Sequence, residues 1–493
     1  MALPVFPDKY QLFIGGKWQD ASDGATYTVT SPCNGQKLSE CAEATRDDVD
    51  AAVKAAHEAF KTWKKTAPAE RYAILNKMAD VIDANRELLA TIETLDNGKP
   101  IRETKGGDML SAASQLRYFA AAIYTDEGAA NMLNEMTLNL ILHEPIGVVG
   151  QIVPWNFPLA MATWKIAAAL SAGCCTVFKP SSHTSLSVLT FAKLVENIVP
   201  PGVLNIITGS GSRAGQYMLD HEGFQKLALT GSTEVGLSVA RAAAEKLIPA
   251  TLELGGKSAN IFFDDCNWDL AIDGIQRGIL SNQGEVCGAG SRIFVQEGIY
   301  DRFVEEAVKA FKKVKVGDPL DMSTQMGALT YEKHLQEVLE YVRIGVEEGA
   351  TIATGGHRIA VGELAKGCFM EPTLLVNVKN SMRVAQEEIF GPVGVVIKFK
   401  DEADVIAMAN DSVYGLAGGV YTQDINRAIN VCRAIETGRM WVNWYGPCPV
   451  GAPFGGYKKS GYGRESHKML MEHYMQTKSI MISLNKNVSG LYS

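Results

Sequence analysis

The chain has 493 residues, of which 46% are hydrophobic and 21% are charged, and its formal net charge at pH 7 is -8. A globular protein of this length has roughly two to four domains and can bury a large hydrophobic core. The net negative charge and the lack of a basic patch argue against a nucleic-acid partner. The nine cysteines have no repeating spacing. That pattern is typical of a reducing compartment, so the cytoplasm is the expected location.

Neither a membrane span nor a secretory signal is expected. The longest uncharged apolar run, residues 166–178, is shorter than the roughly 18 residues that indicate a membrane-crossing helix. The N-terminus lacks a charged region followed by an apolar core. We therefore expect no membrane partner.

The hydrophobic periodicity predicts an α/β protein. Apolar residues recur at helical spacing over residues 46–64 and 69–97. Strands and helices then alternate, which implies a parallel sheet flanked by helices. In chain order, we expect an extended stretch at 138–144, a strand at 148–153, a helix at 160–172, a strand at 176–179, a helix at 187–199, further elements at 202–208 and 215–220, and a strand and helix within 227–245.

A second succession of strands and helices follows Gly256. Its expected elements are strands at 259–263, 291–295, 373–378, 393–399 and 439–443, and helices at 269–280 and 300–313. The boundary at Gly255 and Gly256 is a candidate hinge between two lobes.

Two segments of the first half carry polar groups suited to acyl and phosphate chemistry. Asn156 lies between aromatic residues and prolines, a rigid setting for an amide N–H that donates to a developing oxyanion. Residues 224–236 predict a strand, a glycine turn at Gly231 and then a helix. A glycine there lets a phosphate approach the helix N-terminus at Ser232, where free N–H groups favour anions.

Glu253 and Cys287 are the candidate base and nucleophile. Glu253 lies in an apolar strand that ends in a glycine pair, so desolvation should raise its pKa towards a value useful for a general base. Cys287 lies among glycines, which let a substrate approach its sulfur and let backbone N–H groups face the reacting atom. Nucleophile, base, oxyanion donor and phosphate-binding turn together predict oxidation of an aldehyde by a dinucleotide through a thioester.

Other conspicuous residues are assigned to structure. Cys174 and Cys175 lie in an apolar helix-to-strand region and are expected to pack as small hydrophobic residues. Residues 209–214 match a relaxed dinucleotide fingerprint, and we assign Gly209 and Gly211 to turn geometry. No histidine has metal-ligand spacing and no CxxC pair occurs, so no metal is expected.

From Leu12 to Ile482 the chain resembles the aldehyde dehydrogenase superfamily. The matching motifs, in the family's order and spacing, are residues 154–158, 178–180, 230–236, 253–257, 284–292, 387–392 and 453–458. The resemblance implies a Rossmann-like dinucleotide-binding domain (1–124 and 146–255), an α/β catalytic domain (256–456) and a small oligomerisation element (125–145 and 470–493). It also implies a homo-oligomer, either a dimer or a tetramer.

The resemblance extends to the cofactor site. It places Trp155 and Lys179 in that site, with Lys179 near the adenosine ribose hydroxyls. It also implies that Glu388 holds the nicotinamide ribose and that Phe390 packs beside it.

Ser182 departs from the commoner family pattern, because many NAD-using relatives have a glutamate there that grips both ribose hydroxyls. A serine adds no charge that would repel the 2′-phosphate of NADP, and Arg213 could pair with that phosphate. The sequence therefore favours NADP, with NAD as the alternative.

The expected substrate entrance is aromatic and has no fixed cation. An apolar channel suits small aliphatic aldehydes better than semialdehydes, whose carboxylate would need an arginine. Residues 461–478 look most like bacterial acetaldehyde and short-chain aldehyde dehydrogenases. The residues expected to line the entrance are Phe157, Trp164, Trp444, Tyr445 and Phe454.

Three alternative functions differ from this prediction. A semialdehyde dehydrogenase, such as one for succinate semialdehyde, remains open. A coenzyme-A-acylating member generally lacks the glutamate that Glu253 matches. A crystallin-like structural member would be expected to lack Cys287 or Glu253, and both are present.

Overall fold

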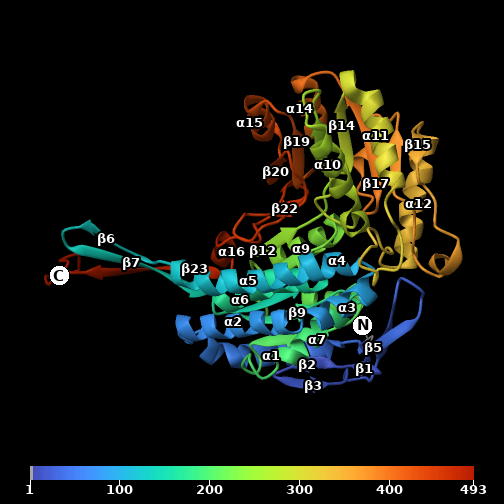
Figure 1. Cartoon of the computed structure of the whole chain (residues 1–493). Coiled ribbons are helices and arrows are strands. Elements are labelled where there is room, and N and C mark those ends of the chain that lie inside the picture. Colours follow the sequence, from blue (N-terminus) through green and yellow to red (C-terminus); the bar gives the residue numbers. More distant parts are fainter. Residues whose placement is uncertain (1–3, 493) are drawn as a thin grey trace.

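The computed structural model describes residues 4–492, which form two α/β lobes and a projecting ribbon of strands (Figure 1). The α/β class expected from the alternating hydrophobic pattern is confirmed. Each lobe is built on one sheet whose central strands are parallel and covered on both faces, which is why those strands are buried along nearly their whole length rather than at alternate residues.

The first lobe contains a sheet of eight strands in the order β22-β12-β11-β8-β9-β10-β2-β3. The five strands from β12 to β10 pair in parallel, whereas β22 at one end and β2 and β3 at the other pair antiparallel. The strand bounds are β2 Leu12–Ile14, β3 Lys17–Gln19, β8 Val148–Ile152, β9 Cys175–Lys179, β10 Leu204–Ile206, β11 Lys226–Thr230, β12 Ala250–Glu253 and β22 Gly461–Tyr462.

Helices cover this sheet. Their bounds are α1 Arg46–Trp63, α2 Pro68–Ala84, α3 Arg86–Asn97, α5 Met109–Ala122, α6 Pro158–Ser171, α7 Leu186–Val195, α8 Gln216–Asp220 and α9 Thr233–Glu245. The helix expected over residues 69–97 is two helices, because the backbone leaves helical geometry at Asn85. A small sheet of β1 Lys9–Tyr10, β5 Lys37–Ala42 and β4 Thr26–Thr30 lies near the N-terminus.

The second lobe has a sheet of seven strands in the order β15-β16-β17-β14-β13-β19-β20, and β15 alone is antiparallel to its neighbour in that sheet. The strand bounds are β13 Ala259–Phe262, β14 Arg292–Gln296, β15 Thr351–Thr354, β16 Thr373–Val376, β17 Val393–Phe399, β19 Ala417–Tyr421 and β20 Arg439–Val442. The larger helices are α10 Trp268–Leu280, α11 Tyr300–Lys312, α12 Glu332–Glu347, α14 Glu402–Asn410 and α15 Ile425–Ala434.

The third unit is an antiparallel ribbon of three strands, here called the arm, that projects from the body of the molecule (Figure 1). It consists of β6 Ala129–Asn134, β7 Thr137–Pro145 and β23 Met475–Ser483. Every residue of β6 is exposed.

The strand order places a crevice in the first lobe. The chain moves from β8 to β9 and β10 on one side, and to β11 and β12 on the other side. In such sheets the connections leave in opposite directions at the switch point, and ligands bind beyond the carboxyl ends of the strands there. The segment that carries Asn156 follows β8, and Gly231 follows β11.

Candidate active site

Two cavities meet at Cys287. One, of about 450 Å³, lies towards the second lobe, and the other, of about 580 Å³, lies at the crevice of the first sheet. Cys287 and Met161 line both cavities. A molecule in either cavity can therefore approach the same sulfur from its own side.

The backbone turns sharply before Cys287. Helix α10 ends at Leu280, and Asn282, Gln283 and Gly284 then adopt left-handed φ angles of 46°, 54° and 73°. Such conformations are costly for residues with side chains and mark functional turns when the surrounding structure holds them. A Cβ at Gly284 would lie 2.2 Å from the carbonyl oxygen of Gly391, so only glycine fits.

Glu253 ends β12 and is 2% exposed. It lines the crevice cavity together with Cys287, and neither of its carboxylate oxygens has a hydrogen-bond partner within residues 4–492. The glycine pair at 255 and 256 lets two other parts of the chain approach the end of β12 closely. A Cβ at Gly255 would meet a Glu388 oxygen at 2.2 Å, and one at Gly256 would meet the Cys287 carbonyl oxygen at 2.6 Å.

Burial dominates the electrostatics of both reactive groups. Desolvation raises the pKa of Glu253 to about 8, and the Lys165 ammonium and the Cys287 thiol only partly oppose it. Desolvation and the nearby Glu253 carboxylate raise the pKa of the Cys287 thiol well above its ordinary value. The resting cysteine is thus a protonated thiol, and a carboxylate that titrates near neutral pH faces the same cavity.

Asn156 lies at the joint between the two lobes and is 1% exposed. Its side-chain amide donates to the Glu285 carbonyl oxygen at 2.8 Å, which leaves a second N–H on the same nitrogen. Its own backbone carbonyl accepts from the Asn282 amide at 2.8 Å. Asn156 therefore lines the crevice cavity beside Cys287.

The crevice cavity collects five of the expected cofactor residues, namely Trp155, Gly231, Ser232, Glu388 and Phe390. Glu388 accepts a hydrogen bond from the Gly256 N–H at 2.9 Å, and burial raises its pKa to about 7. The Ser232 side chain accepts from the Val235 N–H and thereby caps α9. The Phe390 and Trp155 rings pack edge to face, with centroids 5.2 Å apart.

These residues fit a dinucleotide. At Gly231 an added Cβ would make only ordinary van der Waals contact with the Leu229 side chain, at 3.4 Å or more, so the turn is not tightly packed on that side. Apart from that of Val235, which Ser232 caps, the N–H groups in the first turn of α9 can donate to an anion at this end. Glu388 offers a buried carboxylate that can accept from hydroxyl groups.

Three expected cofactor residues lie outside this cavity. Lys179 is 3% exposed and donates to the carbonyl oxygens of Pro180 and Gly209. Burial lowers its pKa to about 8. Ser182 is half-buried, in the turn that precedes α7. Arg213 forms an ion pair with Asp23 and lies 3.9 Å from Glu43, so its charge is already partly neutralised.

The cavity towards the second lobe is mainly apolar and contains four of the five expected aromatic residues, namely Phe157, Trp164, Tyr445 and Phe454. Trp444 is not among its lining residues. It is 46% exposed, and Trp441 lines the cavity instead. Trp441 lies within β20, whereas Trp444 follows the strand, after Asn443 with its left-handed φ of 52°.

Several residues that line the cavities could not be identified from the sequence. Asp108 and Arg277 line the aromatic cavity, and Tyr331, His334 and Glu337 line the crevice cavity. They come from helices or turns that bear no motif. A five-residue π-helical turn that ends at Asp108, Thr104–Asp108, is the kind of local feature that often marks a functional position.

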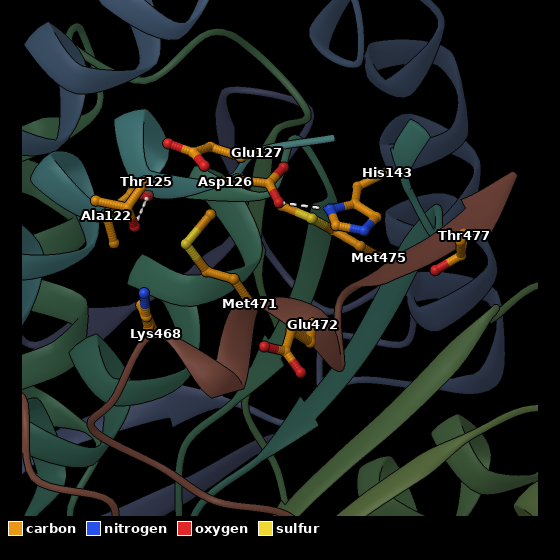
Figure 2. Close-up of a pocket in the computed structure, with 10 residues that line it drawn as sticks. All are labelled: Ala122, Thr125, Asp126, Glu127, His143, Lys468, Met471, Glu472, Met475 and Thr477. Carbon is orange, nitrogen blue, oxygen red and sulfur yellow. Dashed lines mark hydrogen bonds and ion pairs between the residues drawn. The ribbon is translucent and has the colours of Figure 1, made fainter. Parts of the chain in front are cut away.

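A third cavity, of about 420 Å³, lies at the base of the arm (Figure 2). His143 and Asp126 form a 2.6 Å contact in it, and Lys468 and Glu472 come from the segment before β23. It has no cysteine, so it is separate from the reactive centre. Within residues 4–492 no group of three histidine, cysteine or acidic side chains could hold a metal ion. No helix in this range is long and apolar enough to cross a membrane.

Comparison with known proteins agrees with this geometry. The model of the aldehyde dehydrogenase family matches residues 18–480. The chain belongs to the aldehyde dehydrogenase family. It is 46% identical to an acetaldehyde dehydrogenase from Pseudomonas aeruginosa, over 100% of this chain and 98% of that protein. It is thus an NAD(P)-dependent aldehyde dehydrogenase.

Two solved aldehyde dehydrogenase structures are closely similar. A Bacillus cereus aldehyde dehydrogenase in complex with NAD+ has a TM-score of 0.95 at 41% identity, covering 97% of each chain. A Staphylococcus aureus betaine aldehyde dehydrogenase in complex with NAD+ has a TM-score of 0.96 at 38% identity, covering 98% of this chain and 97% of that one. The aldehyde dehydrogenase fold expected from the sequence is confirmed.

Proposed function

We propose that this aldehyde dehydrogenase oxidises short aliphatic aldehydes, of which acetaldehyde is the model, to carboxylic acids. The observation that carries the proposal is the meeting of an aromatic cavity and a dinucleotide crevice at one cysteine. The 46% identical acetaldehyde dehydrogenase supports the same substrate class.

In the proposed reaction, the Cys287 sulfur bonds to the aldehyde carbon. The thiol proton leaves to a base, and Glu253 is the base that faces the same cavity. The free N–H of the Asn156 amide and the Cys287 backbone N–H stabilise the oxyanion. The dinucleotide, when bound, supplies the hydride acceptor that turns this adduct into a thioester.

Hydrolysis then releases the acid. Glu253 in its carboxylate form removes a proton from water, whose oxygen attacks the thioester carbon and displaces the Cys287 sulfur. A buried carboxyl with a pKa of about 8 suits this step, because it can both take and release a proton near neutral pH. The presence of this base also favours water over coenzyme A as the acyl acceptor.

The size and chemistry of the aromatic cavity support an apolar substrate. Its volume of about 450 Å³ and its ring-lined walls suit an aliphatic chain. Arg277 also lines it and is only weakly paired, with Asp273 at 4.0 Å, so a semialdehyde is the second candidate. An Arg277→Ala variant separates the two: it should lose activity towards succinate semialdehyde only if the arginine binds a carboxylate.

We propose that both NAD and NADP serve as cofactors. The similar structures from Bacillus cereus and Staphylococcus aureus contain NAD+. Ser182 adds no repulsion towards a 2′-phosphate, but Arg213 must first leave Asp23 to pair with that phosphate. NADP use should therefore depend on how readily this ion pair opens.

We propose that the first sheet with its helices binds the dinucleotide, the second carries the nucleophile, and the arm mediates assembly into a dimer or tetramer. The cytoplasm is the proposed location. An exposed three-stranded ribbon with apolar side chains is a surface that proteins usually cover.

The direct test is Cys287→Ala. This variant should retain dinucleotide binding, measured by fluorescence quenching, and lose aldehyde oxidation by several orders of magnitude. Cys448→Ala is the matched control, since Cys448 lines the same aromatic cavity. Substantial turnover by Cys287→Ala would reject the covalent route.

A further inference from the structure

Lys99 is a fully buried lysine, at 0% exposure, that no step above uses. Its ammonium donates to the Asp108 carboxylate at 2.5 Å and to the Asn156 backbone carbonyl oxygen at 3.0 Å. It also lies 3.8 Å from the centroid of the Phe157 ring. The three N–H groups of the ammonium are thus directed at a carboxylate, a carbonyl and an aromatic face.

The Asn156 carbonyl belongs to a closed hydrogen-bonded ring. The Asn282 side-chain amide donates both to this carbonyl, at 2.8 Å, and to the Glu285 carbonyl, at 3.0 Å. The Asn156 side-chain amide donates to the same Glu285 carbonyl at 2.8 Å. The ring joins residues 155–159, here called the oxyanion loop, to the turn that precedes Cys287, and Lys99 donates to the ring from outside.

The end of α3 supports the segment 155–159 at two further points. The Asn97 amide donates to the Trp155 carbonyl oxygen at 2.9 Å. Glu93 accepts from the Leu159 N–H at 3.1 Å. Residues 93–99 therefore hold the oxyanion loop in place through hydrogen bonds along its length.

We propose that Lys99 is a positioning residue for the oxyanion hole. By holding the Asn156 carbonyl, it fixes the peptide plane and thus the direction in which the Asn156 side chain presents its free N–H. This inference rests on the proposed role of Asn156. Asp108, which lines the substrate cavity, accepts a second hydrogen bond from the same ammonium and balances its charge.

The consequence is specific to steps that pass through an oxyanion. Acylation of Cys287 by p-nitrophenyl acetate forms an S–C bond and breaks the ester C–O bond, and nitrophenolate leaves with the electron pair. This reaction passes through a tetrahedral oxyanion. Alkylation of the same sulfur by iodoacetamide displaces iodide and forms no oxyanion. The pair of reactions therefore separates oxyanion stabilisation from thiol reactivity.

The test compares both rates in purified full-length variants. Lys99→Met should lower the acylation rate about 10- to 100-fold, less than the ~100- to 1000-fold typical for loss of an oxyanion donor itself, and leave the alkylation rate within about twofold. Asp108→Asn breaks the same buried pair but keeps the Lys99 bond to the carbonyl, so it should affect acylation much less. Lys105→Met, in the same π-helical turn but ion-paired with Glu87, is the control and should change neither rate.

A double-variant cycle gives the decisive result. If Lys99 acts through Asn156, Lys99→Met should cause no further loss in an Asn156→Ala background, because coupled residues are non-additive. Equal losses of acylation and alkylation, an Asp108→Asn effect as large as that of Lys99→Met, or multiplied losses in the double variant would each overturn the proposal. The charge-balanced variant Lys99→Met/Asp108→Asn repeats the test if the single variant folds poorly. If Asn156→Ala alone leaves acylation unchanged, the proposed role of Asn156 fails instead.

Discussion

Glu253 combines deep burial with a position beside the nucleophile. Desolvation raises its pKa to about 8, so at lower pH the carboxyl is mostly protonated and cannot act as a base. The base form appears as the pH rises through about 8. Hydrolysis of the acyl enzyme should therefore accelerate up to tenfold per pH unit below 8 and level off above it. Pre-acylated enzyme, followed by mass spectrometry across pH 6–10, measures this rate.

Two variants test whether Glu253 causes that pH dependence. Glu253→Gln should remove the rising limb of the plot of hydrolysis rate against pH and let the acyl adduct on Cys287 accumulate. Glu388→Gln, in the same cavity, should keep the limb and move it to slightly lower pH, because the Glu388 carboxylate contributes to the raised pKa of Glu253. A limb that survives in Glu253→Gln would assign the base to another group.

Cofactor preference should respond to charge around Arg213. Asp23→Asn removes the ion-pair partner of Arg213, so the arginine becomes available to a 2′-phosphate and kcat/KM with NADP should rise several-fold. The same ratio with NAD should change little, since NAD has no phosphate there. Steady-state kinetics with both cofactors make the comparison.

Ser182→Glu tests the same proposed phosphate position by adding a negative charge instead of removing one. A new carboxylate near the 2′-phosphate would repel it by about 1 to 4 kcal/mol, which is roughly 5- to 1000-fold in affinity. NADP efficiency should fall while NAD use is kept, because the acid can accept from both ribose hydroxyls. If neither substitution alters the NAD-to-NADP ratio, Arg213 and Ser182 do not form the phosphate site.

At the scale of elements, the turn after α3 depends on one glycine. Gly98 ends the helix with a φ of 92°, and a Cβ there would lie 2.4 Å from the Ala328 carbonyl oxygen. Gly98→Ala should therefore destabilise the protein by about 1 to 3 kcal/mol or more and displace Lys99. Gly106→Ala, with no atom within 4 Å of the added Cβ, should be neutral or slightly stabilising. Urea unfolding midpoints of both variants test this, and equal midpoints would contradict it.

The elements also show what the sequence could predict. The strand-and-turn motifs around Glu253 and Gly231 could be predicted because they are local in the sequence. An apolar strand followed by glycine has few other interpretations. Helix ends are harder to predict, because residues 69–97 keep their helical periodicity across the break at Asn85. The contacts of Lys99 could not be predicted, since its partner Asn156 is 57 residues away and the contact joins two loops, one after α3 and one before α6.

At the scale of the whole molecule, the reactive centre depends on both lobes. Asn156 and Glu253 come from the first sheet, and Cys287 comes from the connection between α10 and β14 of the second. The glycine pair between the lobes lets Glu388 and the Cys287 carbonyl approach the end of β12. The candidate hinge at Gly255 and Gly256 is thus also a place of tight packing, where added side chains would push the nucleophile away from its base.

The arm has one apolar face, and this face should drive assembly. The strand register places one set of side chains on the same face, namely Met132, Leu138, Leu140, Leu142, Ile480 and Ile482. Met481, which pairs with Asn139, points to the opposite face. Because an isolated apolar ribbon is unfavourable in water, we expect a second copy to cover the first face.

Ile480→Lys/Ile482→Lys should therefore dissociate the oligomer, because two ammonium groups would be buried at the contact without partners. Met481→Lys, on the same strand but on the other face, should leave assembly intact. Light scattering coupled to gel filtration gives the mass of each. A monomeric wild-type protein, or equal dissociation by both substitutions, would contradict the assignment of this face. Since none of the residues that line the two cavities at Cys287 belongs to the arm, the dissociated variant should keep the wild-type rate of thiol alkylation, which separates loss of assembly from loss of the folded centre.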